Sequence, residues 1–147
     1  MISLVPFAAG EEAELATWVS AYFAEDGLEF SSRVASSCGL LLSHPEWGSA
    51  FRVVREEATL GYIVLTYGFD HEVGGRVGMV TDFYLEPSAR GQGIGHSVLA
   101  LLQSFAQEMG LAELELFVLK HNLGARRLYA SLGFQPADDR EYLTLRL

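Results

Sequence analysis

A strand that runs into a glycine-rich loop, which opens directly into a helix, is the feature that most constrains the fold of this chain. β-Branched and aromatic residues from Arg76 to Leu85 predict the strand, and three glycines follow between positions 91 and 95. Apolar residues then recur at helical spacing from Ile94 to Met109, and Gly110 stands where a C-cap glycine belongs. Such a helix start leaves backbone N–H groups unpaired at the positive end of the helix dipole. The segment therefore predicts a binding site for a phosphate or pyrophosphate.

The residues of this loop narrow the choice of phosphate ligand. Gly91, Gly93 and Gly95 let a phosphate approach the backbone without meeting a Cβ atom, and Arg90 adds a positive charge. A P-loop needs a lysine after its last glycine, but His96 stands there. A dinucleotide fingerprint that starts at Gly91 needs a glycine at position 96, where this chain has His96. Neither of these two nucleotide motifs fits the loop.

The spacing of apolar residues predicts the remaining elements. Apolar residues at helical spacing predict three more helices, near residues 11–24, 31–44 and 125–132. Runs of strand-forming residues predict strands over 51–55, 60–67, 76–85, 114–118 and 142–147, with a short extra strand near Leu4 as an option. Polar residues 56–58 predict a hairpin turn, and residues 68–75 predict a connection that contains glycine. The order α-α-β-β-β-α-β-α-β indicates a mixed α/β fold of the α+β type.

Length and charge limit the class of protein. The chain has 147 residues and no Pro/Ser-rich linker or repeat, which predicts one domain over 1–147. A formal net charge of −9 disfavours binding to nucleic acid, and it suits either a cationic acceptor or mere solubility. No apolar run is long enough to span a membrane, and residues 1–10 lack the basic start of a signal peptide. We therefore expect a cytoplasmic protein that binds neither nucleic acid nor membrane.

Cysteine and histidine positions give no sign of a metal site. Cys38 is the only cysteine, which excludes an intrachain disulfide and a cysteine-based zinc site. The four histidines are far apart and form no ligand pair of the H-x-x-x-H type. Cys38 stands at helical spacing from Val34 and Leu42, which predicts a buried structural thiol. We expect no metal.

The loop also resembles a known family signature. Arg90, Gly93 and Gly95 fill the acetyl-CoA pattern Arg/Gln-x-x-Gly-x-Gly/Ala of the GNAT acetyltransferase superfamily. The strand end from Asp82 to Pro87 is similar to that of the family, and residues Asn122 to Phe134 fit Asn-x-x-Ala-x-x-Leu-Tyr-x-x-x-Gly-Phe. The three matches occur in the family's order, whereas the first fifty residues or so contribute little. The resemblance implies a mixed, mostly antiparallel central sheet flanked by helices.

The resemblance also implies how acetyl-CoA is held. The backbone of Phe83 and Leu85 would pair with the pantetheine amides at a point where the strand splays from its neighbour. The N–H groups from Gly91 to His96, together with Arg90, would hold the pyrophosphate. The full set of implied cofactor residues is Phe83, Tyr84, Leu85, Arg90, Gly91, Gln92, Gly93, Ile94, Gly95, His96, Ser97, Asn122 and Ala125.

The catalytic residues are implied with alternatives. Tyr129 would be the general acid that protonates the departing CoA thiolate, because a phenol is neutral at pH 7 and can donate a hydrogen bond. The alternative role of Tyr129 is to pack in the core. Asn122 would contact the cofactor or only cap its helix. Sequences that resemble polyamine acetyltransferases carry a glutamate where this chain has Thr81 and Asp82. We expect Asp82 to be the general base, with Glu72 or a water chain as alternatives.

The function that follows is direct transfer of acetyl from acetyl-CoA to a primary amine of a small molecule or peptide. The acidic stretch 25–29 either attracts that amine or is a solvated turn. One alternative is a CoA-binding regulatory module that has lost catalysis, and another is a nucleotide-binding, kinase-like enzyme. Homodimers are frequent in such families, so a dimer is compatible with the sequence.

Overall fold

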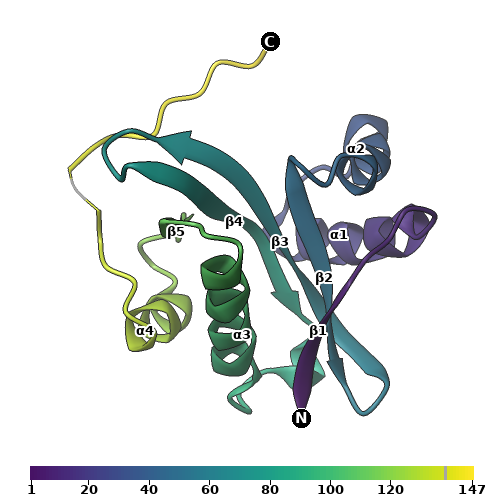
Figure 1. Ribbon diagram of the computed structural model, residues 1–147. Coiled ribbons are helices and arrows are strands. Elements are labelled where there is room, and N and C mark those ends of the chain that lie inside the picture. Colours follow the sequence, from purple (N-terminus) through teal and green to yellow (C-terminus); the bar gives the residue numbers. More distant parts are fainter. Residues whose placement is uncertain (138) are drawn as a thin grey trace. The chain divides into compact units, whose positions relative to one another are not determined.

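The computed structural model describes residues 1–137 and 139–147, and the chain divides into two compact units, Met1–Phe117 and Val118–Leu147. Each unit is described by itself. The first contains β1 (Ile2–Pro6), α1 (Glu12–Asp26), α2 (Ser32–Ser43), β2 (Gly48–Arg55), β3 (Ala58–Asp70), β4 (Gly75–Leu85), the 3₁₀ turn η1 (Pro87–Ala89), α3 (Ile94–Glu108) and β5 (Glu113–Leu116) (Figure 1). The second contains α4 (Leu123–Ser131).

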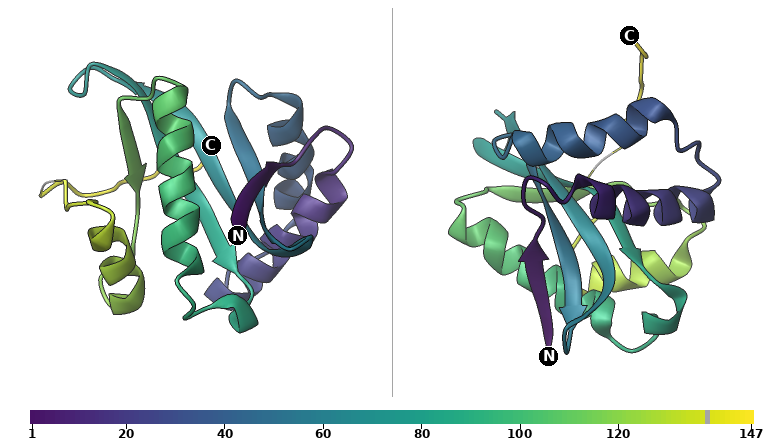
Figure 2. Two further views of the ribbon diagram at one scale, coloured as in Figure 1. Left: turned by 60° about the horizontal axis from the view of Figure 1, so that its bottom comes forward. Right: turned by 90° about the vertical axis from the view of Figure 1, so that its right-hand side faces the viewer.

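The sheet of the first unit is mixed and mostly antiparallel, which confirms the predicted fold class. Its strands lie in the order β1-β2-β3-β4-β5, with only β5 parallel to its neighbour β4. Helices α1 and α2 cover one face of this sheet and α3 covers the other (Figure 2). The strand near Leu4 forms as β1 and pairs with β2. This layering buries one stripe of each helix against one sheet face.

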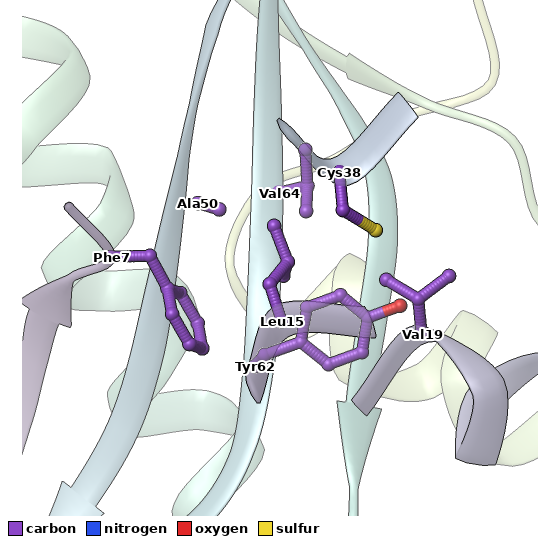
Figure 3. Close-up of a cluster of buried hydrophobic side chains, with 7 residues drawn as sticks. All are labelled: Phe7, Leu15, Val19, Cys38, Ala50, Tyr62 and Val64. Carbon is purple, nitrogen blue, oxygen red and sulfur yellow. The ribbon is translucent and has the colours of Figure 1, made fainter. Parts of the chain in front are cut away.

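A cluster of buried side chains lies between the sheet and helices α1 and α2. Leu15 and Val19 of α1 and Cys38 of α2 pack there with residues of the sheet, and Tyr62 at its centre is fully buried (Figure 3). Cys38 is 4% exposed, so the buried thiol expected from the sequence is confirmed. On the opposite face, Phe51 packs edge-to-face on Phe105 of α3, with ring centroids 5.0 Å apart.

Arg52 fastens the start of α1 to β2. Its guanidinium is only 8% exposed and donates to Glu14 at 2.8 Å, to Glu11, and to the Pro6 carbonyl at 3.3 Å. It also lies 4.0 Å from the centroid of the Phe7 ring. The hydrogen bonds from Arg52 lower the pKa of Glu14, and those from Ala8 and Arg52 lower the pKa of Glu11. Glu11 and Glu14 remain 39% and 44% exposed, so water screens their attraction to the largely buried Arg52.

Several boundaries confirm the sequence predictions and others correct them. Ser31 caps α2 by accepting from the Val34 N–H at 3.2 Å, as expected. The strands β3 and β4 extend to Asp70 and from Gly75, so the connection is shorter than the predicted 68–75. β5 ends at Leu116, which leaves Val118 outside the strand.

The predicted strand over residues 142–147 is wrong. None of the strand pairings in the described part of the chain includes these residues, and their apolar side chains are exposed, from 70% at Tyr142 to 100% at Leu147. Alternating apolar residues make a strand possible, but a strand forms only where a neighbour supplies backbone hydrogen bonds. The local pattern therefore misled the prediction.

None of the helices in the described residues has the length and apolar character that a membrane crossing demands.

The β2–β3 hairpin closes through an unfavourable turn. Arg55 pairs with Ala58, so Glu56 and Glu57 form a two-residue loop with φ values of 50° and 71°. Positive φ at both positions is what a type I′ turn requires, and asparagine and glycine normally provide it. A residue with a Cβ atom is strained there.

Replacing Glu57 with glycine should relieve this strain. We expect Glu57→Gly to raise the free energy of unfolding by about 1 kcal/mol, measured by denaturant titration. Glu57→Ala is the matched control, since it removes the same charge but keeps a Cβ at positive φ. An equal gain in both variants would show that charge, and not backbone strain, limits the hairpin.

Candidate active site

An extra residue in β4 decides the direction of the candidate base. Val64 of β3 lies opposite Asp82, but the next residue, Leu65, lies opposite Val80, so Thr81 is a β-bulge. Val64 belongs to the cluster under α1 and α2, so Leu65 and Val80 face the other side by alternation. Strict alternation would have put Asp82 on the face of Val80. The bulge turns it towards α1 and α2 instead.

Asp82 lines a cavity of about 300 Å³ between that sheet face and the two helices. The lining residues are mostly apolar: Leu15, Val19, Phe23, Val34, Ser37, Cys38, Leu41, Val64, Thr66, Thr81 and Asp82. The carboxylate of Asp82 accepts a hydrogen bond of 2.7 Å from the Tyr62 hydroxyl at Oδ2. Burial raises the pKa of Asp82, and the hydrogen bonds from Tyr62 and Thr81 oppose that rise. Burial and the nearby Asp82 charge also raise the pKa of Cys38.

The end of β4, beside this carboxylate, has no neighbouring strand on one side among the described strands. The pairing of β4 with β5 ends at Val80 and Leu116. The Glu86 N–H donates to the Leu60 carbonyl of the β3 edge at 2.9 Å, so by alternation the backbone groups of Phe83 and Leu85 point away from β3. Among the described strands none lies on that side of Phe83 and Leu85. The edge of β4 beyond Val80 is therefore open, except that the Leu85 carbonyl accepts a hydrogen bond from the Arg90 guanidinium at 2.8 Å.

The loop after β4 ends at a helix start that no side chain caps. Gly91 and Gly93 have φ values of 73° and 78°, and a Cβ atom at either would meet only open space. The first bond within α3 runs from the Ser97 N–H to the Gly93 carbonyl at 3.3 Å. The N–H groups of α3 ahead of Ser97 therefore lack a capping side chain. Gly95 and His96 lie inside this first turn, and the Ser97 hydroxyl bonds the Gly93 carbonyl at 3.4 Å.

The side chains of the loop make protein contacts of their own. The Arg90 guanidinium donates to Glu25 of α1 at 2.5 Å and to the Leu85 carbonyl at 2.8 Å, above the ring of Tyr84. Glu25, from the acidic stretch of the sequence, thus holds Arg90. Gln92 donates to the Ser88 carbonyl at 2.8 Å.

Arg55, at the end of β2, is a residue that sequence reasoning missed. Its guanidinium donates to the Gln92 side chain at 3.1 Å, which places a second cation beside the loop. The two residues are 37 positions apart, and no motif connects them. Only the pairing of the strands brings them together.

The second unit holds the remaining predicted residues. Asn122 caps α4 by accepting from the Ala125 N–H at 3.1 Å, which is the capping role left open by the sequence. Tyr129 is half-buried and packs on Phe134, with ring centroids 5.8 Å apart. Burial raises the pKa of Tyr129, so its phenol keeps its proton at neutral pH.

Glu72, the alternative base, lies in the turn between β3 and β4 and is exposed. Its backbone N–H donates to Asp70 at 2.8 Å. The part of β4 from Gly75 to Asp82 separates this turn from the Asp82 side chain, a span of roughly 20–25 Å at the rise of a strand. The structure does not bring Glu72 to the cavity. No cluster of three or more His, Cys, Asp or Glu side chains suited to a metal occurs in the described residues.

Comparison with known proteins agrees with this geometry. A family model described as the acetyltransferase (GNAT) family matches residues 11–134. The chain belongs to the GNAT acetyltransferase family. A Bacillus subtilis protein, the uncharacterized N-acetyltransferase YycN, is 42% identical over 59 residues, which are 40% of this chain and 38% of that protein. The thialysine N-epsilon-acetyltransferase of Bos taurus is 37% identical over 67 residues, 46% of this chain and 39% of its own. The matched stretches thus span only about two fifths of these relatives.

The fold of this GNAT acetyltransferase is shared over nearly its whole length with solved structures. An integron cassette protein from the mobile metagenome of Cole Harbour Salt Marsh superposes with a TM-score of 0.83 at 28% identity. The superposition covers 98% of this chain and 90% of that protein. The two proteins therefore share the same overall fold.

The hydrogen bond between Tyr62 and Asp82 can be tested in this acetyltransferase. Removing the hydroxyl in Tyr62→Phe takes away a bond that favours the charged carboxylate, so the pKa of Asp82 should rise further. A carboxyl-carbon NMR titration measures this pKa directly. Tyr67→Phe is the matched control on the same strand, because the Tyr67 hydroxyl bonds Ser49 and not Asp82. An unchanged Asp82 titration in Tyr62→Phe would contradict the assigned bond.

Proposed function

We propose that the protein transfers an acetyl group from acetyl-CoA directly to a primary amine of a small molecule or peptide. The observation that carries this proposal is the arrangement of β4 at its bulge. Asp82 points into a cavity on one face, and the backbone groups of the next residues, Phe83 and Leu85, face an edge of the same strand that no described strand covers, although the Leu85 carbonyl already accepts from Arg90. An amine acceptor and a thioester could therefore meet at one point, which is the positioning that such a reaction needs most.

The chain's residues fit acetyl-CoA on three counts. The uncapped N–H groups at the start of α3 suit a pyrophosphate, and the positive end of the helix favours its charge. Gly91 and Gly93 leave open space where a Cβ atom would stand. Arg55 and Arg90 place positive charge beside the loop, although each already contacts a protein partner. Membership of the acetyltransferase family supports the same cosubstrate.

Two residues would move protons in this reaction. Asp82 would accept the proton of the incoming ammonium, with Tyr62 holding the carboxylate in place. Tyr129 would give its proton to the departing thiolate, a role supported by its pKa above the ordinary tyrosine value. Acetyl-CoA, when bound, supplies the thioester that is attacked. We propose that residues 1–117 and 118–147 act as one domain, since the family match extends over most of both units.

The start of α3 can be tested with a side chain that imitates the ligand. We expect Gly93→Asp to lower the affinity for acetyl-CoA at least tenfold in isothermal titration, because the carboxylate would cap the helix and repel a pyrophosphate. Gly93→Asn is the matched control, with nearly the same size and backbone preference but no charge. Equal affinities in the two variants and the wild type would place the cosubstrate elsewhere.

The base can be tested by its pH dependence. A base works only when unprotonated, so kcat/KM should fall as the pH falls through the pKa of Asp82, above the ordinary aspartate value of 3.8. Asp82→Asn should remove this acidic limb and lower kcat/KM by about 10²–10⁴-fold in a CoA-release assay. Its affinity for acetyl-CoA should not change.

The exposed Asp26 provides a control, because Asp26→Asn removes the same charge away from the cavity. If Asp82→Asn kept full activity and the same pH profile, the assignment of the base would be wrong. Binding of acetyl-CoA without turnover on any amine would favour a regulatory module over an enzyme.

A further inference from the structure

The cavity that contains Asp82 also carries information about the acceptor. Six of its lining residues are aliphatic or aromatic, namely Leu15, Val19, Phe23, Val34, Leu41 and Val64. Cys38 adds a thiol whose pKa is raised by burial, so it is neutral and adds no charge. Asp82 is the only charged residue among those that line the cavity in the described part of the chain. The surroundings are apolar except at the point where a proton must be taken.

We propose that the acceptor is a small primary amine with an apolar body and a single positive charge. This inference rests on the proposed acetyl transfer and specifies its substrate. The ammonium group lies at the Asp82 carboxylate, and the apolar body lies against the side chains of α1 and α2. Burial of such a body contributes roughly 25 cal/mol for each Å² removed from water.

A second cationic group on the acceptor finds no second opposite charge in this cavity, because Asp82 is the only charged residue among its described lining residues. The hydroxyls of Ser37 and Thr66 donate to the Val34 carbonyl at 2.6 Å and the Met79 carbonyl at 3.5 Å, so towards an ammonium they offer only neutral oxygen lone pairs. A second ammonium inside the cavity would be buried without an opposite charge, which is strongly unfavourable. Polyamines and aminoglycosides are therefore disfavoured as acceptors.

The size of the cavity gives the same answer. A volume of about 300 Å³ equals the space of roughly ten water molecules in the liquid. That suffices for an aliphatic or arylalkyl amine of modest length. The volume lies at the lower end of the range of roughly 300–1,000 Å³ for ligand pockets, so an acceptor of several sugar rings would be incompletely buried.

Ser37 marks an opening of the cavity on α2. It lines the cavity and is nevertheless exposed to solvent. Its neighbour Ser36 is also exposed and does not line the cavity. The same substitution at these two positions therefore gives a matched pair, one at the opening and one beside it.

The test compares acceptors that differ in one feature. CoA release would be measured with hexylamine and 1,6-diaminohexane, which differ by one terminal amine, and with 2-phenylethylamine, spermidine and kanamycin. We expect kcat/KM to be at least tenfold higher for hexylamine and 2-phenylethylamine than for the three polycationic compounds. Ser37→Phe should lower kcat/KM for the two apolar amines at least tenfold, whereas Ser36→Phe should leave it unchanged.

The outcomes separate the two proposals. Isothermal titration with acetyl-CoA is run on the wild type and on both serine variants. If the wild type did not bind acetyl-CoA, the proposed function itself would be wrong. If acetyl-CoA binds and a polycationic compound is the better acceptor, the acetyl transfer stands and the inference about the acceptor is overturned. Equal turnover by Ser37→Phe and Ser36→Phe would also overturn it, because the apolar amines would then bind outside this cavity.

Discussion

The bulge at Thr81 is the constraint on which the candidate active site depends. It adds one residue to β4 and thereby reverses the alternation of side chains along the rest of the strand. Asp82 consequently faces the cavity under α1 and α2. The backbone groups of Phe83 and Leu85 face the edge of β4 that lies beyond its pairing with β5. If the same residues formed a regular strand, Asp82 would lie on the face of Val80 and the cavity would contain no carboxylate. One inserted residue thus sets both the chemistry of the acceptor side and the edge available to the cosubstrate.

Salt bridges at both ends of α1 hold this helix over the face of the sheet that Asp82 occupies. At its start, the largely buried Arg52 binds Glu11 and Glu14, whose side chains are 39% and 44% exposed. At its end, Glu25 binds Arg90, and both side chains are about half exposed. The carboxylates at the two ends are similarly exposed, so the contacts differ mainly in the cation: the Arg52 side chain is 10% exposed and the Arg90 side chain 42%. The start of α1 is therefore the fixed end, and the Glu25 end couples the acceptor side to the phosphate loop more weakly.

The parts of this structure that sequence could predict are the ones encoded locally. The helix at 94–108 and its glycine-rich start follow from spacing within one turn, and Ser31 and Asn122 cap their helices through residues three positions on. The bulge depends on how β4 pairs with β3, and Arg55 reaches Gln92 across 37 positions. Pairing is a tertiary property, so neither was visible. The failure of the 142–147 strand has the same cause, because alternation does not supply a partner strand.

This difference also explains why the family was easier to recognise than the acceptor. The proposed cosubstrate site consists of backbone groups at Phe83, Leu85 and the start of α3, and a backbone site demands only glycines and a helix at the right spacing. The proposed acceptor site consists of side chains such as Leu15 of α1 and Cys38 of α2, which any apolar residue of similar volume could replace without altering the fold. A pattern in sequence therefore identifies what the backbone binds. What the cavity binds follows only from the side chains that the fold assembles there, and here these are apolar around one carboxylate.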